Sequence, residues 1–306
     1  MPTRNFLFLQ GPHGPFYRRL AAKLRLTGAG VWRIGFNAGD AAFWWPQQGY
    51  IPFQDDLSEW PDRLTTILRD KAITDIVIYG DTRPVHAIAA QQARAAGLRL
   101  HVFEEGYLRP YWVTYERGGS NGHSRLMDLT LSQMRATGSA EVPTPPIGWG
   151  DMRQHIFWGA AYHWFVMFRN RRYPKFRPHR ALPVRREALL YSKRLALMPA
   201  FALQRFIATR RIEAAGYPYH LCLLQLEHDA SFQAHSPFTS MADFLEVVVD
   251  GFAKGAPTHH HLVFKAHPLE SGQTPLRKLV YAAAKANGVA DRVHYVRGGK
   301  LARLLN

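Results

Sequence analysis

The feature that most constrains the fold is an alternation of short apolar runs with longer segments of helical spacing, which occurs twice along the chain. This alternation is typical of βαβ units, in which parallel strands form a sheet and helices cover its faces. The first series consists of 5–9, 16–26, 31–36, 57–70, 76–79, 85–96 and 99–103. The second consists of 220–225, 241–253, 261–265, 275–287 and 292–296. The sequence therefore predicts an α/β protein with two parallel sheets.

The two series predict three parts of the chain. We expect an N-terminal Rossmann-like domain at 1–140, a helical and basic connecting region at 141–215, and a C-terminal Rossmann-like domain at 216–306. The connecting region begins with Pro and Gly residues and then lacks strand signals. Residues 298–306 look like a loop that enters a helix after only three strands. We therefore expect the last domain to be truncated, as part of a longer domain.

The charge balance restricts the classes of partner. The chain has 39 Lys and Arg residues against 23 Asp and Glu residues, a net charge of +16, which favours polyanions, anionic lipid surfaces or phosphorylated substrates. Its single cysteine excludes an intrachain disulfide framework. No apolar run reaches the roughly 18 residues of a membrane-spanning helix, and the first apolar run is too short for a secretory signal. We expect a cytoplasmic protein or one that lies on a membrane surface.

A Glu-Glu-Gly motif ends the last strand predicted in the first series. Ligands of open α/β sheets bind beyond the carboxyl ends of strands, where this motif lies. Its carboxylates, Glu104 and Glu105, face opposite sides because side chains alternate along a strand. Glu105, next to the permissive Gly106, is the better candidate for general acid/base chemistry. The alternative is a structural role as a helix cap or in an ion pair with Arg109.

A Lys-Ala-His-Pro motif follows the strand predicted at 261–265. Lys265 and His267 lie two residues apart and share one face, and Pro268 holds the imidazole at the edge of the strand. Together the two cationic groups can bind a phosphate and neutralise the charge that develops as a nucleotide leaves. The motif therefore indicates a nucleotide-sugar site.

Two further loops lie at predicted strand ends. The loop with Gln10, Gly11 and Gly14 either cradles a phosphate or simply turns the chain. The other begins at Gln225, contains Asp229 and continues to a His-Ser-Pro-Phe segment with His235 and Ser236. Its carboxylate and Glu105 can flank an anomeric carbon across an interdomain cleft, one as nucleophile and the other as acid/base. The alternative for these loop residues is solvation without chemistry.

Metal chemistry is not expected. The chain has 15 histidines, but it lacks the HExxH, paired-cysteine and Asp-x-Asp patterns of common metal sites. A nucleoside-monophosphate sugar departs as a single phosphate, which Lys265, His267 and a helix N-terminus can stabilise without a metal ion.

Taken in order, the motifs at 103–110, 225–229, 235–238 and 265–268 resemble those of the capsule polysaccharide biosynthesis proteins of the KpsS/LipB type, which are related to KpsC/LipA. The resemblance implies a GT-B-like fold with a cleft between two Rossmann-like domains. It also implies a retaining β-Kdo transferase that uses CMP-Kdo to start the poly-Kdo linker of a capsular polysaccharide. The implied acceptor is a phosphatidylglycerol or lysophosphatidylglycerol lipid, at the cytoplasmic face of the inner membrane and near other capsule assembly proteins.

The resemblance also assigns roles to residues. It implies that Asp229 is the nucleophile, Glu105 the acid/base, and His267 with Lys265 the binding site of the CMP phosphate. Arg109 can pair with the carboxylate of the donor sugar, whether that sugar is Kdo or sialic acid. The remaining residues expected to bind substrate are Gln10, Gly11, Gly14, Glu104, Gly106, Gln225, His235, Ser236 and Pro268.

The predicted connecting region contains an aromatic helical segment at 156–168 and a basic run at 169–180. This composition is typical of an amphipathic anchor on anionic lipid. It is equally typical of an interdomain helix with a solvated basic tail.

Two other functions stay open. CMP-sialic acid transferases also combine an acidic-Gly motif with a His-Pro motif. A non-catalytic basic protein could bind capsule polysaccharide or nucleic acid through residues 169–194, although no RRM, KH, zinc-finger or helix-turn-helix pattern supports nucleic acid. Carboxylates and histidines at strand ends favour an enzyme.

Overall fold

The structure is a computed structural model that describes residues 4–106, 113–137, 153–176, 184–227, 229–268, 270, 272–299 and 301–305. It divides into two compact units, Met1–His179 and Arg180–Asn306, and each is described by itself. The division falls inside the predicted connecting region. Helix α6 (Arg153–Phe168) belongs to unit 1, and helix α7 (Val184–Ala215) belongs to unit 2.

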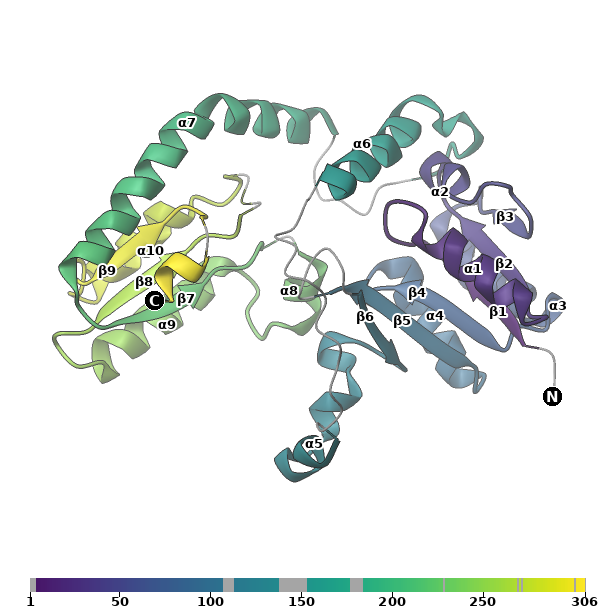
Figure 1. Ribbon diagram of the computed structural model, residues 1–306, viewed down its shortest axis with the longest axis horizontal. Coiled ribbons are helices and arrows are strands. Elements are labelled where there is room, and N and C mark those ends of the chain that lie inside the picture. Colours follow the sequence, from purple (N-terminus) through teal and green to yellow (C-terminus); the bar gives the residue numbers. More distant parts are fainter. Residues whose placement is uncertain are drawn as a thin grey trace. The chain divides into compact units, whose positions relative to one another are not determined.

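Unit 1 contains a six-stranded sheet in the order β3-β2-β1-β4-β5-β6 (Figure 1). The first five strands in the chain are parallel, and β6 runs antiparallel to β5. The strands are β1 (Asn5–Phe8), β2 (Gly30–Gly35), β3 (Tyr50–Pro52), β4 (Asp75–Tyr79), β5 (Arg99–Glu105) and β6 (Val113–Arg117). Their helices are α1 (Phe16–Leu26), α2 (Ala38–Ala42), α3 (Trp60–Asp70), α4 (Pro84–Ala95) and α5 (Leu131–Thr137). Because β1 and β4 adjoin at the centre, the strand order reverses there, and ligands of such sheets bind at this point.

Apolar side chains on both faces of the sheet hold helices against it. On one face, Leu7 and Ile76 pack with Leu64 of α3 and Ala89 of α4. On the other face, Phe8 packs with side chains that include Tyr17 of α1. These central strands are apolar on both faces because both faces are covered.

A buried carboxylate connects the ends of β1 and β2 to α6. Asp40 accepts hydrogen bonds from Gln10 Nε2 (3.1 Å), the Arg33 guanidinium (3.2 Å), the Phe36 N–H (3.0 Å) and the Tyr162 hydroxyl (3.4 Å). Arg33 and Asp40 are 2% and 1% exposed, so their ion pair is shielded from solvent. A buried charge of this kind is tolerated only when it is paired and hydrogen-bonded. Asp40 is therefore the centre of a network that spans four elements of unit 1.

Helix α6 packs one face on this network. A Cβ on Gly39 of α2 would lie 2.5 Å from the Tyr162 ring, so only glycine permits the approach. The Tyr162 hydroxyl also accepts a hydrogen bond from Asn37 Nδ2 (2.6 Å), and the Trp158 ring meets the edge of Phe43. These contacts fix α6 within unit 1.

Unit 2 contains a parallel sheet in the order β7-β8-β9, made of β7 (Tyr219–Leu223), β8 (His261–Lys265) and β9 (Val293–Val296). Helices α9 (Met241–Gly255) and α10 (Leu276–Ala286) pack on one face of the sheet, and the carboxyl-terminal part of α7 packs on the other. A short helix, α8 (Ala230–His235), follows β7. Helix α7 contains Pro199, which lacks the N–H of a regular helical turn, and Figure 1 shows that the helix bends.

The predicted α/β architecture with parallel sheets is confirmed, and the boundaries of most elements lie within a few residues of the expected ones. The sequence analysis did not predict β3, β6 or the short helices α2, α5 and α8. Strand β6 extends the pairing of β5 through Glu104 opposite Thr114 and Glu105 opposite Val113. Both glutamates therefore lie inside the sheet hydrogen-bonding pattern rather than in a loop.

We expect Asp40→Ala to lower the free energy of unfolding by roughly 3–5 kcal/mol, because it leaves the buried Arg33 guanidinium without its anion. Chemical denaturation followed by circular dichroism measures this change. The control is Asp70→Ala, which removes the carboxylate of an exposed pair with Arg69 and should cost less than about 1 kcal/mol. Equal losses for the two variants would contradict the importance of the buried network.

Candidate functional sites at the strand ends

The structure separates the two glutamates of the Glu-Glu-Gly motif. Glu104 lies on the side of β5 that carries Leu100 and Val102 into the core beneath α3 and α4. Its Oε2 accepts a hydrogen bond from Asn121 Nδ2 at 2.7 Å. Glu105 lies on the opposite side, which carries Phe103 toward α1. Both glutamates are partly buried, and Gly106 is buried.

The glycines of the first loop are accounted for by packing. A Cβ on Gly11 would lie 2.4 Å from the Tyr17 ring, and one on Gly14 would lie 3.0 Å from the Trp158 ring. Gly14 also has a φ of +105°, which favours glycine. In the same loop, the His13 ring stacks on Tyr162 with centroids 4.4 Å apart. With the Gln10 amide bonded to Asp40, this loop is fixed against the rest of unit 1.

A polar cluster that the sequence analysis missed lies where β4 and β5 end. Asp81 follows β4, and its Oδ2 accepts a hydrogen bond from the Ser120 N–H (3.2 Å) and lies 3.0 Å from His123 Nδ1. Asn121 of the same loop holds Glu104, and a Cβ on Gly80 would lie 3.3 Å from Glu104 Oε1. We call residues 118–124 the β6 loop. The sequence of this loop, Gly-Gly-Ser-Asn-Gly-His-Ser, predicts a turn. It does not show that the loop lies at these strand ends, because that position depends on β6 running antiparallel to β5.

In unit 2, the Lys-Ala-His-Pro motif begins at the last residue of the middle strand. Lys265 is 6% exposed and shares the side of β8 that carries Val263 toward α7. Desolvation by burial lowers the pKa of the Lys265 ammonium group. Among the described residues, the Lys265 ammonium has no hydrogen bond or ion pair. His267 is partly buried, and the carbonyl of exposed Pro268 accepts a hydrogen bond from Arg194 of α7.

The other predicted residues of unit 2 follow β7. Gln225 and Asp229 are exposed, and the carbonyl of Asp229 accepts a hydrogen bond from the N–H of Gln233 as α8 begins. His235 and Ser236 are partly buried at the end of α8, where Ser236 Oγ accepts a hydrogen bond from the Phe238 N–H (3.1 Å). The loop after β7 and the Lys-Ala-His-Pro motif after β8 thus lie on neighbouring strand ends, because the Leu224 N–H donates to the Lys265 carbonyl (2.9 Å).

Glu227 has a structural role between these motifs. One of its carboxylate oxygens accepts a hydrogen bond from the N–H of Met241 at the start of α9 (2.8 Å), and the other lies 3.4 Å from the Thr274 hydroxyl. This carboxylate fixes the loop after β7 to the first turn of α9, where a negative charge is favourable.

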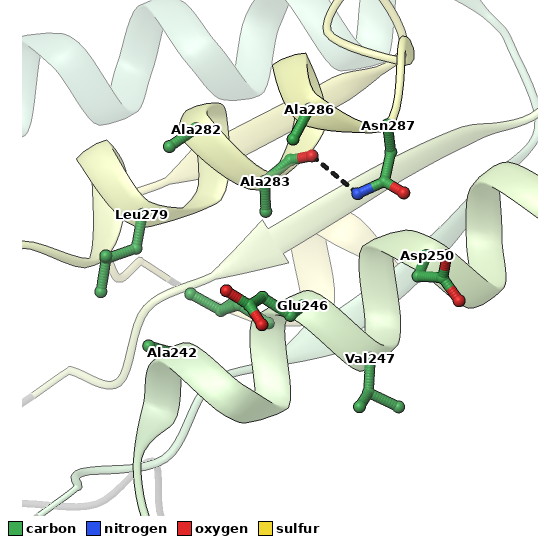
Figure 2. Close-up of a pocket in the computed structure, with 10 residues that line it drawn as sticks. Ala242, Glu246, Val247, Asp250, Leu279, Ala282, Ala283, Ala286 and Asn287 are labelled. Carbon is green, nitrogen blue, oxygen red and sulfur yellow. Dashed lines mark hydrogen bonds between the residues drawn. The ribbon is translucent and has the colours of Figure 1, made fainter.

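A groove of about 590 Å³ lies elsewhere in unit 2, between α9 and α10 (Figure 2). Small side chains such as Ala282 and Ala286 line it together with Glu246 and Asp250. None of the residues that the sequence analysis selected lines this groove. The chemistry-bearing residues instead gather at the strand ends.

The structure thus groups the predicted residues within each unit. Glu104, Glu105 and Gly106 lie at one sheet edge of unit 1, and the two motifs of unit 2 lie together at another. Arg109 lies outside the described residues. The expectation that no metal ion is needed stays a prediction, as do the roles of the individual residues.

Comparisons with known proteins place the chain in a family. The profile of the capsule polysaccharide biosynthesis proteins matches residues 74–306, and the chain belongs to this family. The chain is 29% identical over 308 residues to the capsule polysaccharide export protein KpsS of Escherichia coli, with 99% of this chain and 77% of that protein covered. It is 33% identical over 279 residues to the capsule polysaccharide modification protein LipB of Neisseria meningitidis serogroup A, with 88% and 66% covered. The resemblance to the KpsS/LipB type is therefore confirmed.

Two solved structures are similar at low levels. A glycosyltransferase from Rickettsia africae has 7% identity and a TM-score of 0.33, with 100% of this chain and 71% of that chain covered. A UDP-GlcNAc 2-epimerase from Neisseria meningitidis has 12% identity and a TM-score of 0.27, with 99% and 74% covered. At TM-scores this low, neither structure informs the fold or the chemistry of this chain.

We expect Lys265→Met to stabilise the unliganded protein near pH 7, raising its Tm by roughly 2–4 °C. The substitution removes a buried cation whose folded-state pKa is lowered, so the charged form carries a penalty at every pH below that pKa. As the pH rises from the folded-state pKa toward the ordinary lysine value, this penalty disappears from the wild type. Calorimetry at several pH values should therefore show a difference in Tm that shrinks under alkaline conditions.

The control is Lys278→Met, which removes an exposed cation of α10 and should leave Tm nearly unchanged. A lower Tm for Lys265→Met at neutral pH would show that the charged ammonium stabilises the fold instead.

Proposed function

We propose that this chain is a retaining glycosyltransferase that transfers Kdo from CMP-Kdo to a phosphatidylglycerol-type acceptor, starting the linker of a capsular polysaccharide. Membership of the capsule polysaccharide biosynthesis family supports the biological setting. The KpsS and LipB relatives are named for capsule polysaccharide export and modification. The chain covers 77% and 66% of these relatives, so the substrates and partners belong to the proposal.

The observation that carries the proposal is the buried Lys265 at the end of β8. A desolvated cation without an anionic partner among the described residues is costly unless a ligand supplies the anion. It lies at the carboxyl end of the middle strand, where ligands of parallel sheets bind. The phosphate of CMP has the complementary charge, and His267 lies two residues further along. This arrangement favours a nucleotide-linked donor over a neutral sugar.

The proposed reaction uses both motifs of unit 2. Asp229 attacks the anomeric carbon of Kdo as the bond from that carbon to the CMP phosphate breaks, and Lys265 with His267 stabilises the departing phosphate. The acceptor oxygen then displaces Asp229, which restores the original configuration at the anomeric carbon. A base must take the proton of the acceptor hydroxyl, and the sequence motif assigns this step to Glu105.

We expect Asp229→Ala to lower kcat by roughly 10³-fold or more, because it removes the proposed nucleophile. The assay incubates the chain with CMP-Kdo and a phosphatidylglycerol analogue, and mass spectrometry detects the glycosylated lipid. The control is Asp250→Ala, which removes a carboxylate of α9 from the groove in Figure 2 and should leave the rate unchanged. Full activity of Asp229→Ala would refute the proposed mechanism. If the wild type transfers sialic acid from CMP-sialic acid faster than Kdo from CMP-Kdo, the donor is CMP-sialic acid.

We further propose that α6 contacts the lipid surface that carries the acceptor. While Trp158 and Tyr162 pack within unit 1, another face of α6 exposes large apolar side chains. These are Phe157 (61% exposed), Trp164 (45%), Met167 (52%) and Phe168 (64%). Among the side chains that the structure describes, α6 is thus apolar both on the face that packs in unit 1 and on an exposed face.

Basic residues adjoin the exposed apolar face of α6. Exposed cationic side chains follow the helix at once: Arg169, Arg171, Arg172 and Lys175. The Arg169 guanidinium lies 5.9 Å from the centre of the Trp164 ring. Apolar side chains beside cations suit the interface of an anionic bilayer, where each cation contributes roughly 1 kcal/mol. Among the described residues, no helix combines the length and apolar character needed to cross a membrane.

We expect the double substitution Trp164→Ser and Phe168→Ser to weaken binding to vesicles that contain phosphatidylglycerol by roughly tenfold or more. Vesicle flotation measures the bound fraction. The matched control replaces Leu26 and Leu57, which are exposed on other elements of unit 1, by Ser. If the two double variants bind the vesicles equally well, α6 does not contact the lipid. If the wild type binds neutral vesicles as well as vesicles that contain phosphatidylglycerol, the cations do not contribute to binding.

A further inference from the structure

Positively charged side chains from β8, from the loop after β9 and from α7 gather at the carboxyl end of the unit 2 sheet. The first is Lys265, which pairs with Val296 in the register of β8 and β9. Val296 packs with Ile212 of α7, so this pair of residues lies on the α7 side of the sheet. Lys265 is 6% exposed. Its side chain therefore starts on the α7 side and is almost enclosed where β8 ends.

Two arginines adjoin this position from β9 and α7. Arg297 directly follows β9, and its guanidinium carbon lies 3.9 Å from the centre of the Phe201 ring of α7. One turn further along α7, Arg205 packs against the loop after β9, because a Cβ on Gly299 would lie 2.7 Å from Arg205 Cδ. Gly299 also has a φ of +90°, so glycine permits both this backbone conformation and the close approach. The contacts of two cationic side chains thus hold the end of β9 against α7.

These three cationic groups have no carboxylate partner among the residues that the structure describes. None of the ion pairs there includes Lys265, Arg205 or Arg297. Glu270 follows the Lys-Ala-His-Pro motif, but its carboxylate accepts a hydrogen bond from the N–H of Gly272. The two arginines are only partly buried, so solvent reaches them. Like charges beside a buried lysine repel one another, and an anionic ligand offsets that repulsion.

The cluster carries more positive charge than one phosphate requires. The phosphate of a CMP-linked sugar is a diester with a single negative charge, and the proposed function assigns it to Lys265 with His267. A guanidinium group presents paired N–H donors, which match the two oxygens of a carboxylate. In a CMP-linked 2-keto acid sugar, the carboxylate and the phosphate oxygen are bonded to the same carbon. A site for this carboxylate must therefore adjoin the phosphate site, as Arg205 and Arg297 adjoin Lys265.

We propose that Arg205 and Arg297 bind the carboxylate of the donor sugar and so select an acidic sugar over a neutral one. This inference rests on the proposed function, because it takes Lys265 as part of the phosphate site. It places the carboxylate contact in the same unit as that phosphate site, whereas the sequence analysis considered Arg109 for this contact. A nucleoside-diphosphate sugar carries a second phosphate in place of the carboxylate, and the experiment distinguishes the two ligands.

The test uses isothermal titration calorimetry to measure the Kd of CMP, of CMP-Kdo and of CMP-Kdo methylated at its sugar carboxylate. We expect the wild type to bind CMP-Kdo at least roughly tenfold more tightly than the methyl ester, because the ester lacks the negative charge. Arg205→Met and Arg297→Met should each reduce this ratio to about threefold or less, while the Kd of CMP stays unchanged. Methionine retains apolar packing, and unchanged CMP binding shows that each variant is folded.

The matched control is Arg210→Met. Arg210 is an exposed arginine of α7 whose guanidinium carbon also lies near a phenylalanine ring, 5.5 Å from the centre of Phe206. This substitution removes the same charge from the same helix and should preserve the ratio of the two Kd values. Lys265→Met should instead weaken the binding of CMP, CMP-Kdo and the ester by a similar factor, because all three carry the phosphate.

The outcomes separate this site from the proposed function. A wild type that binds CMP-Kdo and its ester equally overturns the carboxylate site, as does a ratio that survives both arginine substitutions. Tighter binding of UDP-GlcNAc than of CMP-Kdo, lost in the two arginine variants, also overturns it and makes this a site for a second phosphate. A wild type that discriminates against the ester but transfers no Kdo overturns the transfer reaction alone. Binding of neither CMP nor CMP-Kdo overturns the proposed donor together with this site.

Discussion

The arrangement of unit 1 depends on one buried ion pair, between Arg33 of β2 and Asp40 of α2. Removing these charges from water is costly, so the remaining hydrogen-bonding capacity of the carboxylate must be used. Gln10 and Tyr162 use it, and they lie in the loop after β1 and in α6. The hydrogen bonds that Asp40 accepts therefore set the position of α6, whose other face exposes apolar side chains. They also set the conformation of the loop after β1, on which α6 packs.

Lys265 and Asp81 present the opposite situation. Each is a buried charged residue at a strand end, and each retains hydrogen-bonding capacity that the described residues do not use. A protein interior rarely keeps such groups for stability, because an apolar residue of similar size costs less. The Lys265 cation therefore marks the position in unit 2 where we propose that a ligand supplies the missing anion.

The sequence predicted the parallel architecture well because buried parallel strands and their helices produce strong, separate apolar patterns. It predicted Lys265 and His267 at a strand end for the same reason. It could not predict the Asp81–His123 pair, since these residues are 42 positions apart and meet only because β6 returns antiparallel to β5. Nor could it decide between Glu104 and Glu105, since that choice depends on the register of β5 against β6 and on Asn121.

Strand β3 has a consequence for how unit 1 associates with other molecules. It forms one edge of the sheet, contains only three residues and ends at Pro52, which has no N–H to donate. Short edge strands with proline are poor templates for the addition of a foreign strand. This edge therefore resists the uncontrolled growth of the sheet from one molecule to the next. Association through this part of unit 1 must rely on side-chain surfaces, which can be reversible and selective, rather than on shared backbone pairing.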